Sequence, residues 1–212
     1  MGAIGDPIGV GAVANLSRPG GNVTGFSTQN YELEAKRLEL LRELLPGMTR
    51  IGLLGNTDNP YVVAALKQVK LLAEQGGLKP EVVSIEAREA LEGGLLRLAR
   101  VQPDGVLVAA APALFPYRKD IVEFMARHRL PAIYPFREFA EAGGLIAYAT
   151  NFDDLFRQAA DYVDRVLRGA PPGELPVQQA ATFELVINQK TAGALGLAIP
   201  TMLLVRADEV IE

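Results

Sequence analysis

Between residues 50 and 150, short apolar runs alternate with segments whose apolar residues recur at helical spacing. The runs cover residues 50–55, 80–86, 105–111, 131–134 and 144–149. Apolar runs this short are typical of parallel strands that are covered on both faces. Strands that alternate with helices form right-handed βαβ units and therefore a parallel sheet. The pattern predicts a doubly wound, five-stranded α/β domain of the flavodoxin-like kind.

The two flanks of this domain contain helix and strand patterns, but neither flank has enough strands for a sheet of its own. Residues 8–16 are small and apolar and are expected to be helical from about residue 10, and further helices are expected over residues 32–45, 152–168 and 190–196. Extended segments are expected over 23–27, 176–181 and 183–188. We therefore predict that residues 1–48 form the later part of a first lobe, 49–150 a complete second lobe, and 151–212 a return to the first. The turn at Gly5-Asp6-Pro7 has almost no strand before it, so we expect a piece of a longer protein with an incomplete first lobe.

Composition excludes several classes of function. Apolar residues make up 49% of the chain and charged residues 22%, the mix of a protein able to bury a core. The net charge of −4 and the lack of a Lys/Arg run argue against nucleic-acid binding. Cysteine is absent, which excludes disulfides, thiolate metal sites and a Cys nucleophile. No apolar run approaches the roughly 20 residues of a membrane span, and no secretion signal is expected within the sequence.

Residues suited to catalysis are sparse. His128 is the single histidine and lies at the expected end of a helix, where a polar group suits the helix dipole. A Ser-His-Asp triad or a His-rich metal site would depend on it, so a structural role is favoured and neither an enzyme nor a metal site is predicted. Adjacent acids on a helix point in different directions. Asp153-Asp154 therefore suit a helix N-terminus after a cap at Asn151, and Asp208-Glu209 suit solvated surface.

Residues 9–14 match the dinucleotide fingerprint G-x-G-x-x-A. That motif requires a full apolar strand immediately before it, and the sequence supplies only Ala3-Ile4 there. Close packing of a helix explains the small residues better, and no nucleotide or other cofactor is predicted.

A binding site is predicted at the carboxyl ends of the strands, where open parallel sheets bind their ligands. Aromatic, amide, hydroxyl and guanidinium groups follow these strands and suit a small polar molecule. The residues concerned are Asn56, Thr57, Ala110, Tyr134, Phe136, Arg137, Glu138, Tyr148, Thr150 and Asn151. Alternatives stay open: residues 56–60 equally fit a capping turn, the aromatic residues equally fit the core, and Arg137 with Glu138 fits a surface ion pair.

Several stretches occur in a characteristic order along the whole chain. They are residues 5–11, 16–25, 36–41, 130–144, 183–188, 194–200 and 206–211. Together they resemble the substrate-binding components of ABC transporters of the ABC-sub-bind, or tryptophan-binding-protein-like, family. Members of that family carry a secretion or lipoprotein signal and several βα units before the Gly-Asp-Pro turn, and this sequence departs from them there.

The resemblance implies a two-lobed, type I periplasmic-binding fold that closes by hinge motion over a small solute. It places hinges near residues 47–50, 149–152 and 173–183, and a ligand that is an amino acid or a similar small organic molecule. It implies one ligand-binding residue from the first lobe and six from the second: Asp6, Asn56, Thr57, Ala110, Phe136, Arg137 and Tyr148.

The resemblance also implies partners and a location. The partner would be a membrane permease driven by a separate ATPase, and the protein would be periplasmic or membrane-anchored on the outside of the cell. A homodimer through the incomplete lobe is a further expectation. Two other functions remain open, namely a ligand-sensing regulatory module of the same fold and a nucleotide-dependent α/β enzyme.

Overall fold

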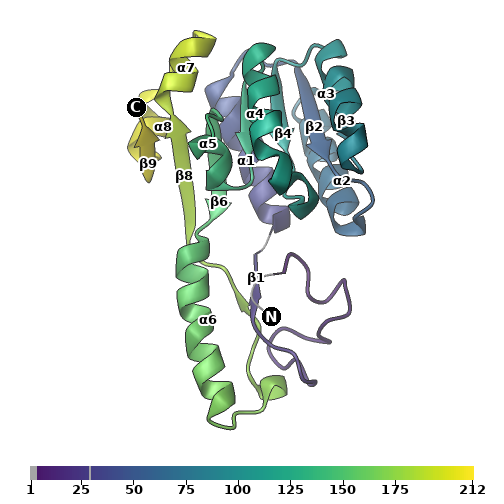
Figure 1. The fold of residues 1–212 in the computed structure, drawn as a ribbon, viewed down its shortest axis with the longest axis vertical. Helices are drawn as coiled ribbons and strands as arrows, with labels where there is room; N and C mark the ends of the chain where they lie inside the picture. The colour runs from purple at the N-terminus through teal and green to yellow at the C-terminus, as the bar shows by residue number, and fades with distance from the viewer. Residues whose placement is uncertain (1–3, 29) are drawn as a thin grey trace. The chain divides into compact units, whose positions relative to one another are not determined.

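The computed structural model describes residues 4–28 and 30–212, apart from the side chains of residues 30 and 31. It divides the chain into two compact units (Figure 1). Unit 1 contains the residues up to 30 together with 150–183, and unit 2 contains 31–149 together with 184–212. The chain therefore passes from one unit to the other three times.

Unit 2 is built on a seven-stranded sheet in the order β3-β2-β4-β5-β6-β8-β9. Its strands are β2 (Arg50–Gly55), β3 (Lys79–Ser84), β4 (Gly105–Val108), β5 (Ala132–Tyr134), β6 (Ile146–Thr150), β8 (Phe183–Asn188) and β9 (Glu209–Ile211). The first five strands pair in parallel and, counted along the chain, have the spatial order 2-1-3-4-5. That is the flavodoxin-like order. The predicted α/β class is thus confirmed, and β8 and β9 extend the sheet beyond the five strands expected.

Helices cover both faces of this sheet, with α4 in front of the strands and α1 behind them in Figure 1. The α-helices are α1 (Asn30–Leu44), α2 (Pro60–Gln75), α3 (Leu91–Arg100), α4 (Arg118–Arg127), α5 (Arg137–Glu141), α7 (Gln189–Leu195) and α8 (Thr201–Arg206). Two 3₁₀ helices, η1 (Arg88–Ala90) and η2 (Pro112–Tyr117), precede α3 and α4. Two glycines of β2 show the packing on either face. A Cβ at Gly52 would meet Leu98 of α3, and one at Gly55 would meet Leu66 of α2.

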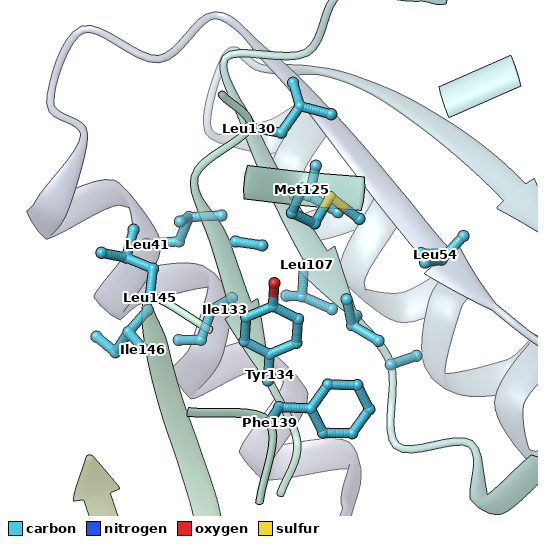
Figure 2. Close-up of a cluster of buried hydrophobic side chains, with 14 of the residues drawn as sticks. Leu41, Leu54, Leu107, Met125, Leu130, Ile133, Tyr134, Phe139, Leu145 and Ile146 are labelled. Carbon is cyan, nitrogen blue, oxygen red and sulfur yellow. The ribbon is translucent and has the colours of Figure 1, made fainter. Parts of the chain in front are cut away.

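The core of unit 2 lies between the sheet and these helices. Figure 2 shows part of it, where Leu107 of β4 and Ile133 of β5 are buried together with Leu41 of α1 and Met125 of α4. Burial of a Leu, Ile or Met side chain stabilises a fold by roughly 1.5–3 kcal/mol. The strands carry apolar residues on both faces because helices cover both.

The compact units begin and end at different residues from the predicted lobes. Residues 31–48 pack with unit 2, since Leu38, Leu41 and Leu44 of α1 are buried in its core. Residues 184–212 also pack there, because β8 lies beside β6 in the sheet and β9 pairs in parallel with β8. The boundary expected near residues 47–50 is therefore replaced by one at 30/31, and the third crossing lies at 183/184.

Unit 1 is smaller. A two-stranded parallel sheet joins β1 (Phe26–Ser27) to β7 (Gln178–Gln179). Helix α6 (Phe152–Leu167) and the 3₁₀ helix η3 (Pro172–Glu174) complete it. The core of this unit contains Phe26, Leu155, Tyr162, Leu175 and Ala180.

Helix α6 begins as the sequence predicts and leaves apolar side chains on its surface. Asn151 caps it, since its Oδ1 accepts a hydrogen bond of 2.9 Å from the Asp154 amide. Three large apolar side chains of the helix, those of Phe156, Val163 and Leu167, are exposed. An apolar groove of about 240 Å³ runs between α6 and β1. Exposed apolar area of this kind is typical of surfaces that contact another segment or protein.

One local prediction was wrong. Residues 10–16, expected as a helix, form turns and bends, with the Ala12 and Val13 amides both donating to the Pro7 carbonyl. Asp208 and Glu209 are exposed, as predicted, and Oδ2 of Asp208 also accepts a 2.7 Å hydrogen bond from the Leu185 amide. Within the described part of the chain, no helix combines the length and apolar character needed to cross a membrane.

Candidate ligand-binding edge

The loop after β2 is fastened to the loop after β3 by Asn56. Its Nδ2 donates to the carbonyls of Ile85 and Glu86, both at 3.1 Å, and its Oδ1 accepts from the Asp58 amide at 3.0 Å. The side chain is buried. Asn59 then caps α2, its Oδ1 accepting from the Tyr61 amide at 3.0 Å. The capping-turn interpretation of residues 56–60 is therefore confirmed.

Thr57 and Ser84 place a pair of hydroxyl groups at the same edge. Their Oγ atoms lie 2.6 Å apart, and the Thr57 amide donates to the Ser84 Oγ at 3.1 Å. Ser84 ends β3, and Thr57 lies just beyond the end of β2. Hydroxyl groups both donate and accept, so this half-buried pair is suited to a polar group of a ligand.

Small residues follow β4. Ala109, Ala110 and Ala111 are all buried, and the Ala110 amide donates a 2.7 Å hydrogen bond to Oε1 of Glu34 in helix α1. The short side chains allow a ligand to approach the backbone closely. The amide N–H of Ala110 is already hydrogen-bonded to Glu34.

Aromatic rings gather where β5 ends and η2 begins. Phe136 packs edge-to-face on Phe115, with ring centroids 5.4 Å apart, and both rings lie 6.4 Å from that of Phe139. Tyr134 stacks on Phe139 at 5.0 Å, and burial raises the pKa of its hydroxyl. Tyr134 therefore belongs to the core, as Figure 2 shows. Phe115 and Phe136 are both half-buried, so their rings are available near the edge.

Arg137 does not pair with Glu138. Its guanidinium contacts three other carboxylates: Nε lies 2.8 Å from Glu141, Nη1 lies 2.8 Å from Glu184, and Nη2 contacts Glu209. The hydrogen bond with Glu141 is the largest of the effects that raise the pKa of Arg137. Burial raises the pKa of the Glu184 carboxyl, and the charge of Arg137 opposes that rise. The arginine thus ties α5 to β8 and β9.

Tyr148 and Asp6 complete the predicted set. Tyr148 lies within β6 and not beyond it, is half-buried, and accepts a 2.8 Å hydrogen bond on its carbonyl from Nε of Arg37. Asp6 belongs to unit 1 and accepts a 2.8 Å hydrogen bond from the Gly9 amide within a turn. Of the seven predicted residues, six lie in unit 2, where the sheet brings the ends of their strands to one edge.

Sequence reasoning missed Glu34 and Arg37, the buried ion pair of α1. Their side chains are each 1% exposed, and Arg37 Nη1 lies 3.0 Å from Glu34 Oε1. Their spacing relative to Leu38 and Leu41 puts all four on one helix face, because residues three and four apart are neighbours on a helix. Their position on the apolar face of α1 could therefore have predicted that these two charged residues are buried.

Among the residues that the structure describes, no three His, Cys, Asp or Glu side chains are arranged to hold a metal ion. The His128 ring stacks on Phe124 with centroids 4.1 Å apart, at the end of α4. This contact agrees with the structural role predicted for the histidine.

Comparison with known proteins identifies relatives over the whole chain. A family model for ABC transporter substrate binding protein matches residues 1–211. A tyrosine-binding protein of Clostridioides difficile is 27% identical over 205 residues, which are 93% of this chain and 56% of the relative. The chain thus spans little more than half the length of that curated relative.

Solved structures agree with this result. An ABC domain from Streptococcus pneumoniae in complex with L-Trp has a TM-score of 0.90 and 29% identity, covering 100% of this chain and 72% of that one. A conserved domain protein from Vibrio cholerae has a TM-score of 0.89 and 28% identity, covering 97% and 68%.

A more distant likeness shows the fold alone. A periplasmic binding protein/LacI transcriptional regulator from Alkaliphilus metalliredigens has a TM-score of 0.56 and 12% identity, covering 77% of this chain and 64% of that one. The fold is therefore of the type I periplasmic-binding kind, as predicted. Since the family model matches almost the entire sequence, the chain belongs to the family of ABC transporter substrate-binding proteins.

Proposed function

We propose that this protein is the solute-binding component of an ABC importer and that its solute is an aromatic amino acid. The observation that carries the proposal is the likeness to the L-Trp complex, which extends over 100% of this chain with a TM-score of 0.90. The tyrosine-binding relative supports the same class of ligand. Both relatives bind amino acids with an aromatic side chain, so the shared chemistry is an aromatic ring beside an ammonium and a carboxylate group.

The carboxyl edge of the unit 2 sheet has groups that suit such a ligand. Phe115 and Phe136 offer ring faces and edges, and aromatic pairs prefer the edge-to-face geometry that these two already adopt. Ala110 leaves room for the backbone to be approached, and the hydroxyl of Thr57 supplies a polar partner. Binding sites for small molecules are mostly apolar, with a few polar groups that fix the orientation of the ligand.

The seven predicted contacts remain proposals, and the hydrogen bonds rank them. We favour Thr57, Ala110, Phe136 and Tyr148 over the others. The amide of Asn56 and the guanidinium of Arg137 already hold other parts of unit 2, and Asp6 accepts a hydrogen bond within its own turn.

The proposed importer role implies a membrane partner and a location outside the cytoplasm. We propose that the loaded protein docks on a membrane permease driven by a separate ATPase, outside the cytoplasm. No catalytic step is proposed, since substrate-binding proteins deliver their solute unchanged. Co-purification with the permease in the presence and absence of ligand would test the partnership, and a permease retained equally by an unrelated binding protein would contradict it.

Thermal unfolding with and without ligand tests the proposed solute. A ligand present at about 100 times its dissociation constant stabilises the folded state by about 2.7 kcal/mol. We expect L-Trp or L-Tyr to raise the unfolding temperature, and L-Ala, ribose and ATP to leave it unchanged. Stabilisation by ATP without any effect of the aromatic amino acids would overturn the proposal in favour of a nucleotide-dependent protein.

A matched pair of variants locates the site. Phe136→Leu should weaken binding of the aromatic amino acid, whereas Phe156→Leu, on the exposed surface of α6, should leave it unchanged. Both variants exchange the same ring for the same aliphatic side chain. Equal affinity of both variants for the ligand, measured by titration calorimetry, would place the site elsewhere.

The homodimer expected from the sequence stays a proposal. Phe156, Val163 and Leu167 of unit 1 supply exposed apolar surface through which two copies would associate. Light scattering on a sizing column would then give twice the chain mass of 22.8 kDa. A mass of one chain at every concentration would contradict the dimer.

A further inference from the structure

The ion pair between Glu34 and Arg37 lies beneath the proposed binding edge and contacts the backbone of three strands or their ends. Glu34 Oε1 accepts from the Ala110 amide at 2.7 Å, just beyond β4. Arg37 donates from Nε to the Tyr148 carbonyl of β6 at 2.8 Å, and from Nη2 to the Pro135 carbonyl after β5 at 3.4 Å. One pair of side chains thus holds the segments just beyond β4 and β5 and the middle of β6, three neighbouring strands of the sheet.

Stability alone does not explain this pair. Both side chains are 1% exposed, and taking two charges out of water costs several kcal/mol per ion. Glu34 Oε2 is buried and has no hydrogen-bond partner among the residues that the structure describes. Apolar residues of similar volume would often serve the fold equally well or better. The pair is therefore better explained by the geometry that it imposes.

The backbone groups that the pair holds coincide with proposed ligand contacts. Ala110 lies just beyond β4 and Tyr148 lies within β6, and their main-chain atoms are the ones that Glu34 and Arg37 bind. The guanidinium is planar and donates in fixed directions, so it sets the spacing between the Tyr148 and Pro135 carbonyls. A binding site keeps its geometry only if supporting residues hold the contacting ones in place.

The pair also lies close to two of the points where the chain leaves unit 2. Glu34 follows the crossing at residues 30/31 by one helical turn, and Tyr148 lies two residues before Thr150, where unit 1 resumes. A comparable contact exists at the third crossing, where Glu184 is the first residue of unit 2 and pairs with Arg137 at 2.8 Å. The unit 2 ends of all three crossings are thus anchored by an arginine and a glutamate.

We propose that Glu34 and Arg37 are positioning residues for ligand binding, which hold Ala110, the segment just after β5 and Tyr148 of β6 in the arrangement that the ligand requires. The inference rests on the proposed function, because Ala110 and Tyr148 are proposed ligand contacts. Neither Glu34 nor Arg37 touches the ligand itself. They act through the main chain of the residues that do.

A double substitution tests the inference without leaving a buried charge unpaired. Glu34→Gln with Arg37→Met removes both charges and nearly conserves the two side-chain volumes. The matched control makes the same changes in the exposed ion pair of Glu43, also in α1, with Arg206, where Nη1 and Oε2 lie 2.8 Å apart. Each protein is measured for its unfolding midpoint without ligand and for its affinity for L-Trp and L-Tyr at a temperature well below that midpoint.

The expected result is a loss of affinity of about tenfold in the buried double variant, in the range seen when supporting residues are changed. Its unfolding midpoint should stay near that of the wild type, and the control should keep wild-type affinity. A residue with a purely structural role would lower the midpoint and leave the affinity of the folded protein unchanged. Wild-type affinity in the folded buried variant would overturn the inference.

A second variant covers the case in which the double variant does not fold. Arg37→Lys keeps the charge beside Glu34 but has a single ammonium group, which cannot reproduce the fixed spacing of the guanidinium donors. It should bind the amino acid more weakly than the wild type, and unchanged affinity would contradict the inference. If the wild-type chain binds neither amino acid, the proposed function fails and this inference fails with it, whereas binding by all variants alike refutes the inference alone.

Discussion

Two adjacent glycines of α3 should respond to the same substitution with opposite signs. Gly93 is exposed, and a Cβ added there would meet no atom within 4 Å. Gly94 is buried against β3, and its Cβ would lie 2.7 Å from Cγ1 of Ile85 and 3.3 Å from the Ser84 carbonyl. Replacing glycine by alanine in a helix stabilises it by roughly 0.5–1 kcal/mol where space allows. Gly93→Ala should therefore stabilise unit 2 by about that amount.

At Gly94 the same gain is opposed by overpacking. Forcing additional volume into a packed core typically costs about 1–3 kcal/mol. Ile85 is only 1% exposed, so its side chain has no solvent-filled space into which it can move. Gly94→Ala should thus be less stable than Gly93→Ala by about 1–3 kcal/mol, since the two variants share the same propensity gain.

Urea unfolding followed by far-ultraviolet circular dichroism measures this difference directly. For a chain of this length, a change of 1 kcal/mol shifts the unfolding temperature by roughly 2–4 °C, so a thermal scan provides an independent check. If Gly94→Ala is as stable as Gly93→Ala, the packing between α3 and β3 has room for a methyl group. That result would refute the account of the close helix–sheet contact.

Three further predictions concern polar groups that hold loops and strands in unit 2. Asp104→Ala should destabilise the protein by about 1 kcal/mol. Hydrogen bonds from backbone amides lower the pKa of Asp104 below its ordinary 3.8, so its contribution to stability is present above that pH and is lost as the pH falls through the lower folded-state pKa. Unfolding free energies of wild type and variant measured between pH 5 and pH 2 would show this loss. Asn56→Ala should cost about 2–3 kcal/mol in chemical denaturation, because it leaves the Ile85 and Glu86 carbonyls in the loop after β3 without their donor. Arg137→Met should raise the pKa of Glu184 further, so the variant should regain stability relative to the wild type as the pH is lowered from 7 toward the ordinary glutamate range; a loss that is independent of pH would contradict this.

The sequence predicts the class of the fold because buried parallel strands and amphipathic helices differ in length and periodicity. The run at residues 105–108 is apolar throughout and forms β4, and the leucines of residues 32–45 recur at helical spacing and form α1. Residues 8–16 show the limit of this reasoning. Small apolar residues have no strong period of their own, and Gly11 adopts a positive φ of 70° that ends any helix there.

The candidate site is less predictable than the fold, because a residue type does not reveal which partner satisfies it. Arg137 and Asn56 follow strands and have groups suited to a ligand, yet both are engaged by side chains or carbonyls far away in the sequence. The carboxylates of Glu184 and Glu209 reach Arg137 from strands 47 and 72 residues further along the chain. No local pattern predicts pairing across such separations.

The domain boundaries differ from those predicted for a related reason. An amphipathic helix shows that one of its faces is buried, but not which sheet covers that face. For α1 the answer lay in two charged residues on the buried face, since Glu34 and Arg37 pair with each other and also bind main-chain groups of β6 and of the segments that follow β4 and β5. A charged pair within an apolar stripe must find such partners, because an isolated buried charge is too costly to persist. Charges that interrupt the buried face of a helix therefore indicate where that helix packs, and in this protein they place α1 against the same strand ends that we propose contact the solute.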